Sequence, residues 1–173
     1  MKRFLTLMAA ALMVATDMFG FDYSDIARGK FSSRSVYGVR SMADGEHYTS
    51  SKGGQIIKYA YVDGSEVDTL YRGGVAFSSY KLIEGESKIL LESDAKYIYR
   101  RSHTACYWLY DIASGVTTEL IADIEGKRDL SIVGGRVAFS ADNNLYVYTL
   151  DGQKLFATTD GKFNNIINGT TDW

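Results

Sequence analysis

Aromatic and β-branched residues alternate with other residues in three separate segments of the chain, and each segment runs into a turn. The segments are 57–62 (IKYAYV), 107–112 (YWLYDI) and 145–150 (LYVYTL). Each is followed by an Asp-Gly or Ser-Gly pair and then by a second strand-like run, at 67–71, 116–121 and 154–158. Alternation with a period of two, bounded by turns of this kind, predicts β-hairpins.

A further turn and strand precede each of these hairpins. The turns contain Gly45, Gly85 and Gly135, and they lead into strand-like segments at 47–49, 89–91 and 137–139. The chain is therefore predicted to be all-β, with three units of about four strands each. Repeats of this length are typical of β-propeller blades, so we expect a partial propeller of about three blades from a larger, eight-bladed ring. A β-sandwich is the alternative that even strand spacing leaves open.

The middle unit is longer than the other two. From leading to trailing glycine, the units span 19 residues (45 to 64), 30 residues (85 to 115) and 17 residues (135 to 152). The second unit thus holds about eleven extra residues, around 93–104. Extra residues in one repeat usually form a loop or a strand extension on one face, often the binding face. This position draws attention to Arg100, Arg101 and His103.

The N-terminus has a different pattern. Lys2 and Arg3 precede an apolar run, residues 4–15, which ends at polar Thr16 and Asp17. A short basic region followed by about a dozen apolar residues is typical of a signal peptide and too short for a membrane-spanning helix. We therefore expect a signal peptide at 1–20, a propeller region at 21–173, and export to the periplasm or the extracellular space. A buried N-terminal helix is the alternative.

Composition narrows the classes of function. Hydrophobic residues make up 46% of the chain, charged residues 23%, and the net charge is −2. This balance is typical of a globular protein and gives no indication of nucleic-acid binding. The single cysteine excludes an internal disulfide, and two histidines with one cysteine are too few to predict a metal site. No cofactor is predicted either, because the glycine pairs fit inter-strand turns rather than a phosphate-binding loop.

Three motifs resemble the dipeptidyl peptidase IV family of prolyl oligopeptidase-type serine peptidases. The first is 99–107 (YRRSHTACY) with 109–111 (LYD), which is similar to the second-blade segment of that family. The second is 137–139 (VAF) with 143–147 (NNLYV), similar to the next blade. The third is 167–173 (INGTTDW), similar to the segment that the family places just before its paired glutamates. Before residue 75 the chain matches only in blade pattern.

The resemblance implies an eight-bladed propeller that caps an α/β-hydrolase domain with a Ser-Asp-His triad. Members of this family remove dipeptides from peptide N-termini, typically after Pro or Ala. By motif position, Arg100 corresponds to the second-blade arginine that helps bind a substrate carbonyl, whereas Arg101 falls where relatives vary. The implied partners are peptides with a free N-terminus and the C-terminal α/β-hydrolase domain, and a homodimer of the full-length protein is compatible with the resemblance.

The departures from the family pattern concern catalysis. The sequence contains no Gly-x-Ser-x-Gly motif, the paired glutamates would follow Trp173, and neither His47 nor His103 has a serine in a recognisable activated context. We therefore expect this chain to be a fragment of a longer protein, with no catalytic residue of its own and no peptidase activity alone. Two alternatives remain: a non-enzymatic exported propeller or β-rich binding module, and a solvated strand-edge charge at Arg100.

Overall fold

The computed structural model describes residues 22–33, 38–100 and 102–170. The chain divides into two compact units, Met1–Tyr37 and Gly38–Trp173, which are considered separately. The described part of the first unit contains one short helix, α2 (Tyr23–Ala27), which has no buried residue. Asp22 caps this helix by accepting a hydrogen bond from the backbone N–H of Ser24 at 3.1 Å. The predicted signal peptide lies outside the described residues, and no described helix is long and apolar enough to cross a membrane.

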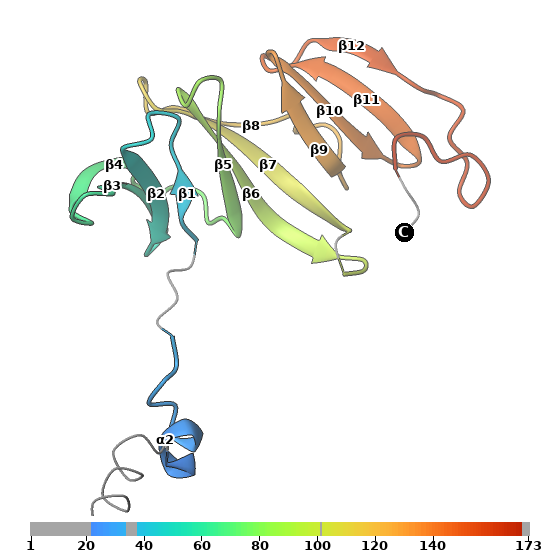
Figure 1. Ribbon diagram of the computed structural model, residues 1–173. Coiled ribbons are helices and arrows are strands. Elements are labelled where there is room, and N and C mark those ends of the chain that lie inside the picture. Colours follow the sequence, from blue (N-terminus) through green and yellow to red (C-terminus); the bar gives the residue numbers. More distant parts are fainter. Residues whose placement is uncertain (1–21, 34–37, 101, 171–173) are drawn as a thin grey trace, which may run out of the picture. The chain divides into compact units, whose positions relative to one another are not determined.

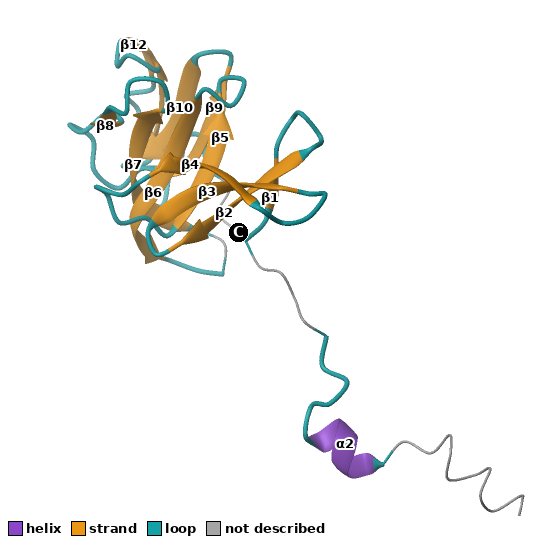
Figure 2. Ribbon diagram, turned by 90° about the vertical axis from the view of Figure 1, so that its left-hand side faces the viewer, coloured by secondary structure: helices purple, strands orange, loops and turns teal. Residues whose placement is uncertain are grey.

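The second unit consists of three four-stranded antiparallel sheets, which we call blades 1, 2 and 3 (Figure 1). In each blade the strands follow one another in sequence order, as in a meander. Strands make up nearly all the regular structure of this unit (Figure 2). Blade 1 contains β1 (Arg40–Ser41), β2 (His47–Lys52), β3 (Gln55–Ala60) and β4 (Glu66–Tyr71). Blade 2 contains β5 (Ser79–Ile83), β6 (Lys88–Tyr97), β7 (His103–Asp111) and β8 (Thr117–Glu119). Blade 3 contains β9 (Arg128–Val133), β10 (Arg136–Ala141), β11 (Asn144–Thr149) and β12 (Lys154–Ala157).

These sheets confirm the predicted all-β class and the prediction of three units with four strands each. Gly53-Gly54 and Gly134-Gly135 form two-residue hairpin loops in which both residues have positive φ. Such loops match the twist of the flanking strands, and glycine adopts positive φ without steric cost. Asp142-Asn143 makes the same kind of loop between β10 and β11, with φ values of 45° and 60°.

The hydrophobic core lies between neighbouring blades rather than inside one sheet. Blades 1 and 2 share a cluster of buried residues that comprises Ile56, Tyr71, Tyr80, Ile89 and Leu91. Blades 2 and 3 share a second cluster that comprises Ala105, Tyr107, Leu120, Ile121, Val137, Phe139, Ala141 and Tyr148. Because each blade covers the apolar face of the next, the blades depend on one another for their stability.

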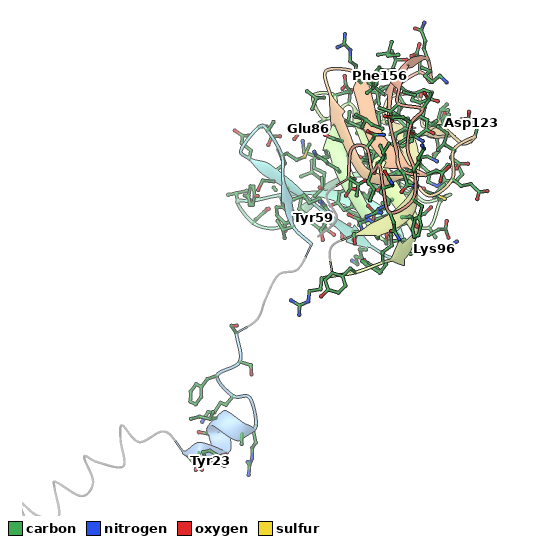
Figure 3. All side chains as sticks on the ribbon, turned by 90° about the vertical axis from the view of Figure 1, so that its right-hand side faces the viewer. Tyr23, Tyr59, Glu86, Lys96, Asp123 and Phe156 are labelled. Carbon is green, nitrogen blue, oxygen red and sulfur yellow. The ribbon has the colours of Figure 1, made fainter. Side chains whose placement is uncertain are left out.

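The hairpin of β6 and β7 is the longest in the unit. Its strands have ten and nine residues, and they continue past Ser79, the first residue of β5. A register shift between Ser93 and Lys96, where three steps along β6 oppose two along β7, marks a β-bulge at which Asp94 has a φ of 52°. In Figure 3, Glu86 and Lys96 mark the two ends of blade 2, near the start and the end of β6. The extra residues predicted around 93–104 therefore form a strand extension with a loop between Tyr97 and His103.

Candidate functional site

Arg100 lies at the tip of the long hairpin of blade 2. The last paired residues of β6 and β7 are Tyr97 and His103, and the chain turns between them in the tip loop, residues 98–102, of which 101 is not described. The backbone N–H groups of Ile98 and Tyr99 both donate to the carbonyl of Ser102, at 2.9 and 3.2 Å. Arg100 is exposed, and it has no hydrogen bond or ion pair with the other described residues. Its guanidinium is thus available to a ligand.

In an extended strand, the neighbouring residues Arg100 and Arg101 would point to opposite faces. Arg100 instead belongs to a bend after β6, so strand alternation does not determine where its side chain points. Arg101 lies outside the described residues. The assignment of Arg100 to a substrate carbonyl therefore stays a prediction that rests on motif position alone.

A cleft of about 240 Å³ lies beside the base of the tip loop, and we call it the tip cleft. Blade 2 contributes Ile98, the first residue of the tip loop, and Thr104 of β7. The opposite side comes from blade 3 and from the last described residues of the chain. The lining residues there are Gly126, Arg128, Ser140, Ala141, Asp142, Asn143, Ile167 and Thr170. The tip of the blade 2 hairpin and the last described residues therefore meet at one cleft, although they lie about 70 residues apart in the sequence. Both regions overlap the motifs described above.

Residues 166–170, the anchored segment, are bound to blade 3. The backbone N–H of Asn168 donates to the carbonyl of Asn143 at 3.0 Å. The Thr170 hydroxyl donates to a carboxylate oxygen of Asp129 at 3.2 Å and also forms a hydrogen bond with the hydroxyl of Ser140, which is only 3% exposed. These contacts fix the side of the tip cleft that faces the blade 2 hairpin, a feature that no sequence pattern predicts.

A β-bulge in β9 places two charged side chains at this position. Ala138 pairs with Ser131 and Ser140 pairs with Arg128, so three steps along β9 oppose two along β10. Asp129 has a φ of 52°, in the left-handed region that non-glycine residues seldom adopt. Bulges next to binding sites often redirect side chains. Here Asp129 reaches the anchored segment, and Arg128 lines the tip cleft.

A second cleft, of about 300 Å³, is lined by the first strands of all three blades together with residues of the long hairpin. His103 and Glu92 face each other in it, with Nε2 and Oε1 3.2 Å apart, although Nε2 is buried without a well-aligned hydrogen bond. Burial, reinforced by the negative charges of Glu92 and Asp129, raises the pKa of Tyr107 well above its usual range. Tyr107 therefore keeps its phenolic proton at neutral pH.

Each of the two histidines has a carboxylate neighbour. His47 Nδ1 lies 2.7 Å from Asp44 Oδ2 in the turn before β2. Within the described ranges neither histidine forms a hydrogen bond with a serine or threonine hydroxyl, and no three His, Cys, Asp or Glu side chains are grouped closely enough to hold a metal ion.

Comparison with known proteins relates this geometry to a family. A family model described as the dipeptidyl peptidase IV (DPP IV) N-terminal region matches residues 84–173, which is just over half of the chain. The matched stretch begins at the turn before β6 and includes the tip loop, the whole of blade 3 and the anchored segment. The resemblance inferred from the three motifs is confirmed.

Individual relatives give the same result. The chain is 30% identical to human prolyl endopeptidase FAP over 158 residues, which cover 86% of this chain and 20% of that protein. It is 29% identical to a probable dipeptidyl-aminopeptidase B of Sordaria macrospora over 90 residues, which cover 50% of this chain and 10% of that protein. The crystal structure of Porphyromonas gingivalis dipeptidyl peptidase 4 superposes with a TM-score of 0.71 at 33% identity, covering 88% of this chain and 24% of that one.

These matches support the propeller prediction over the sandwich alternative. Three consecutive meander sheets of this chain superpose on part of a much longer protein with clear sequence identity. The chain spans about a fifth of the length of the human relative and about a tenth of the length of the fungal one.

Proposed function

Because the chain belongs to the dipeptidyl peptidase IV N-terminal region family, we propose that it is the N-terminal propeller region of an exported serine dipeptidyl peptidase. Such an enzyme removes dipeptides from peptides with a free N-terminus, typically after Pro or Ala. The family match and the similarity to FAP and to dipeptidyl-aminopeptidase B support this assignment. Since the chain spans a small part of these relatives, hydrolysis would be a property of the whole protein.

One observation carries the proposal. The tip loop and the anchored segment belong to two of the motifs that resemble the family's substrate-binding regions, and both flank the tip cleft. In this role the propeller region orients the peptide and limits access, while Arg100 supplies a hydrogen bond to a substrate carbonyl. A guanidinium suits this task because it stays charged and presents several donors in a fixed plane.

The proposed partners follow from the same assignment. Peptide substrates would enter at the tip cleft, and an α/β-hydrolase domain elsewhere in the full-length protein would supply the Ser-Asp-His triad. Export to the periplasm or the extracellular space is supported by the basic and apolar pattern of residues 2–15. A homodimer of the full-length protein is part of the proposal.

The test compares two neighbouring arginines in the full-length protein. Loss of a charged hydrogen bond at Arg100→Ala should cost about 1.5–3 kcal/mol, which lowers kcat/KM for a Gly-Pro anilide roughly tenfold to a hundredfold. Arg101→Ala is the matched control, and its effect should stay within about 0.5 kcal/mol. Steady-state kinetics on purified variants measures both.

Two results would contradict the proposal in different ways. Equal losses for both variants, or a larger loss at Arg101, would show that Arg100 has been assigned wrongly. An intact wild-type protein that releases no anilide would favour the non-enzymatic binding module instead.

A further inference from the structure

Arg128 lines the tip cleft and lacks an acceptor for a buried nitrogen. Its Nε is buried and has no hydrogen-bond partner, and the side chain forms no ion pair within the described part of the chain. The β9 bulge, with Asp129 at a φ of 52°, is the local feature that positions it. A charged side chain with a buried donor that lacks an acceptor is a candidate for binding a ligand.

The chemistry of arginine restricts what the ligand can be. A guanidinium stays protonated at all physiological pH values, so it cannot lose its charge when water is excluded. Shielding a charged donor without an acceptor is unfavourable, and the planar fork of arginine matches two carboxylate oxygens. The tip cleft therefore suits a ligand that carries a carboxylate.

The described acidic side chains around the cleft do not pair with the guanidinium of Arg128. One carboxylate oxygen of Asp129 accepts from the hydroxyls of Thr170 and Ser140, at 3.2 and 3.5 Å, so this group is engaged with the anchored segment. Asp142 lines the cleft but is exposed and forms no ion pair with Arg128. Among the described residues, no carboxylate lies within ion-pair distance of Arg128.

We infer that Arg128 binds a carboxylate of the peptide substrate and gives the tip cleft a preference for peptides that carry one. The inference rests on the proposed peptidase function and adds a specificity-determining residue to it. The carboxylate has two sources in a short peptide, an acidic side chain near the N-terminus or the free C-terminus. Both offer the same pair of oxygens to the guanidinium.

The experiment uses the full-length protein and two matched pairs of substrates. Glu-Pro and Gln-Pro anilides differ only in a side-chain carboxylate, and Gly-Pro-Ala and its C-terminal amide differ only in the terminal one. The variants are Arg128→Ala and Arg128→Gln, the second of which keeps most of the side-chain volume. Arg136→Ala, an exposed arginine of β10, is the control.

In at least one pair, the wild type should cleave the substrate that carries the carboxylate with a higher kcat/KM than its partner that lacks it. The pair that shows this preference identifies whether the carboxylate is that of an acidic side chain or of the C-terminus. Both Arg128 variants should reduce this preference about tenfold to a hundredfold, the contribution of a charged hydrogen bond. Cleavage of Gly-Pro anilide, which has no carboxylate, should fall less in both Arg128 variants than cleavage of the carboxylate-bearing substrate. Arg136→Ala should keep the wild-type preference.

Three results would overturn the inference while the proposed function stands. They are a wild type with no preference in either pair, an unchanged preference in both Arg128 variants, and an equal fall for all substrates including Gly-Pro anilide. The last would indicate a merely structural role. A wild-type protein that cleaves none of the substrates would instead overturn the proposed function, and the inference with it.

Discussion

The two halves of the long hairpin in blade 2 differ in what surrounds them. In the inner half, from Lys88 to Ser93, Ile89 and Leu91 are completely buried against blade 1. In the outer half, beyond the bulge at Asp94, Tyr97 is 74% exposed and Tyr99 in the tip loop is 68% exposed. The same pair of strands thus contributes to the core at one end and extends into solvent at the other.

Because of this difference, the residues that stabilise the fold and the residues proposed to serve binding lie at opposite ends of one hairpin. The inner half packs against neighbouring blades and should therefore tolerate few substitutions. In the outer half Ala95 and Ala105 still pack in the cluster between blades 2 and 3, whereas the residues nearer the tip, such as Tyr97, are exposed and can serve the tip cleft without weakening the fold. In the same way, blade 3 packs against Tyr107 through its core residues, and Arg128 and the anchored segment lie at one end of its sheet.

The largest loss of stability should come from a substitution in the inner half of the hairpin. Leu91→Ala removes a fully buried side chain from the cluster between blades 1 and 2, and should lower the free energy of unfolding by about 2–5 kcal/mol. Tyr97→Ala in the outer half should change it by no more than about 0.5 kcal/mol. Urea unfolding followed by circular dichroism measures both. Similar losses at the two positions would show that the halves are not distinct.

A smaller effect is expected in the anchored segment. Gly169 has a φ of 74°, and a Cβ at this position would lie 2.8 Å from Cδ1 and 3.1 Å from Cβ of Leu145. Gly152 has a φ of 91° with nothing within 4 Å of such a Cβ, so it is the matched control. The left-handed conformation should cost alanine about 1–2 kcal/mol at either site, and Gly169→Ala should cost more because Leu145 must move.

Unfolding experiments on the two glycine variants decide this prediction. Equal destabilisation would mean that the anchored segment is not packed against β11. Hydrogen exchange at the backbone N–H of Asn168, which donates to Asn143, should also become faster in Gly169→Ala and stay unchanged in Gly152→Ala.

The smallest change in stability should come from the ion pair at the inner end of the hairpin. Lys88 Nζ donates to Asp111, and Ser114 donates to the same carboxylate, which holds the pKa of Asp111 below its usual value. A depressed pKa contributes stability that is present above about pH 4, the value for an unfolded aspartate, and is lost as pH falls toward the folded value. Asp111→Asn should therefore reduce the loss of stability on acidification.

Urea midpoints at pH 7, 4 and 3 measure this difference. Asp151→Asn is the control, because the Asp151 side chain has no hydrogen bond or ion pair within the described ranges. A wild type and an Asp111→Asn variant with the same dependence on pH would show that the ion pair makes no measurable contribution.

The sequence predicted the parts of the fold that have regular patterns. Alternating segments such as 145–150 correspond to strands inside the blades, here β11, and the glycine spacing indicated the extension of blade 2. The first strand of each blade was given no residue range from the sequence, since β1 has only two residues and the alternation in β5 and β9 extends over only five and six residues. Short strands between blades depend on tertiary packing rather than on local pattern.

The candidate site was predicted only in part. The extra residues and the family motif identified the region of Arg100, whereas Arg128 carries no signal beyond being a charge next to Lys127. Its position depends on the β9 bulge, and the positive φ of Asp129 cannot be inferred from an aspartate in an otherwise ordinary strand. The contact between Thr170 and Asp129 joins residues 41 positions apart, beyond the reach of any local pattern.

The central claim is that the tip loop and the anchored segment form one peptide-binding site. A crystal structure of the full-length protein with a bound Xaa-Pro substrate analogue tests it most directly. We expect the peptide in the tip cleft, with a carbonyl oxygen about 2.7–3.2 Å from the guanidinium of Arg100. A peptide bound elsewhere, with Arg100 directed into solvent and the tip cleft empty, would contradict the account.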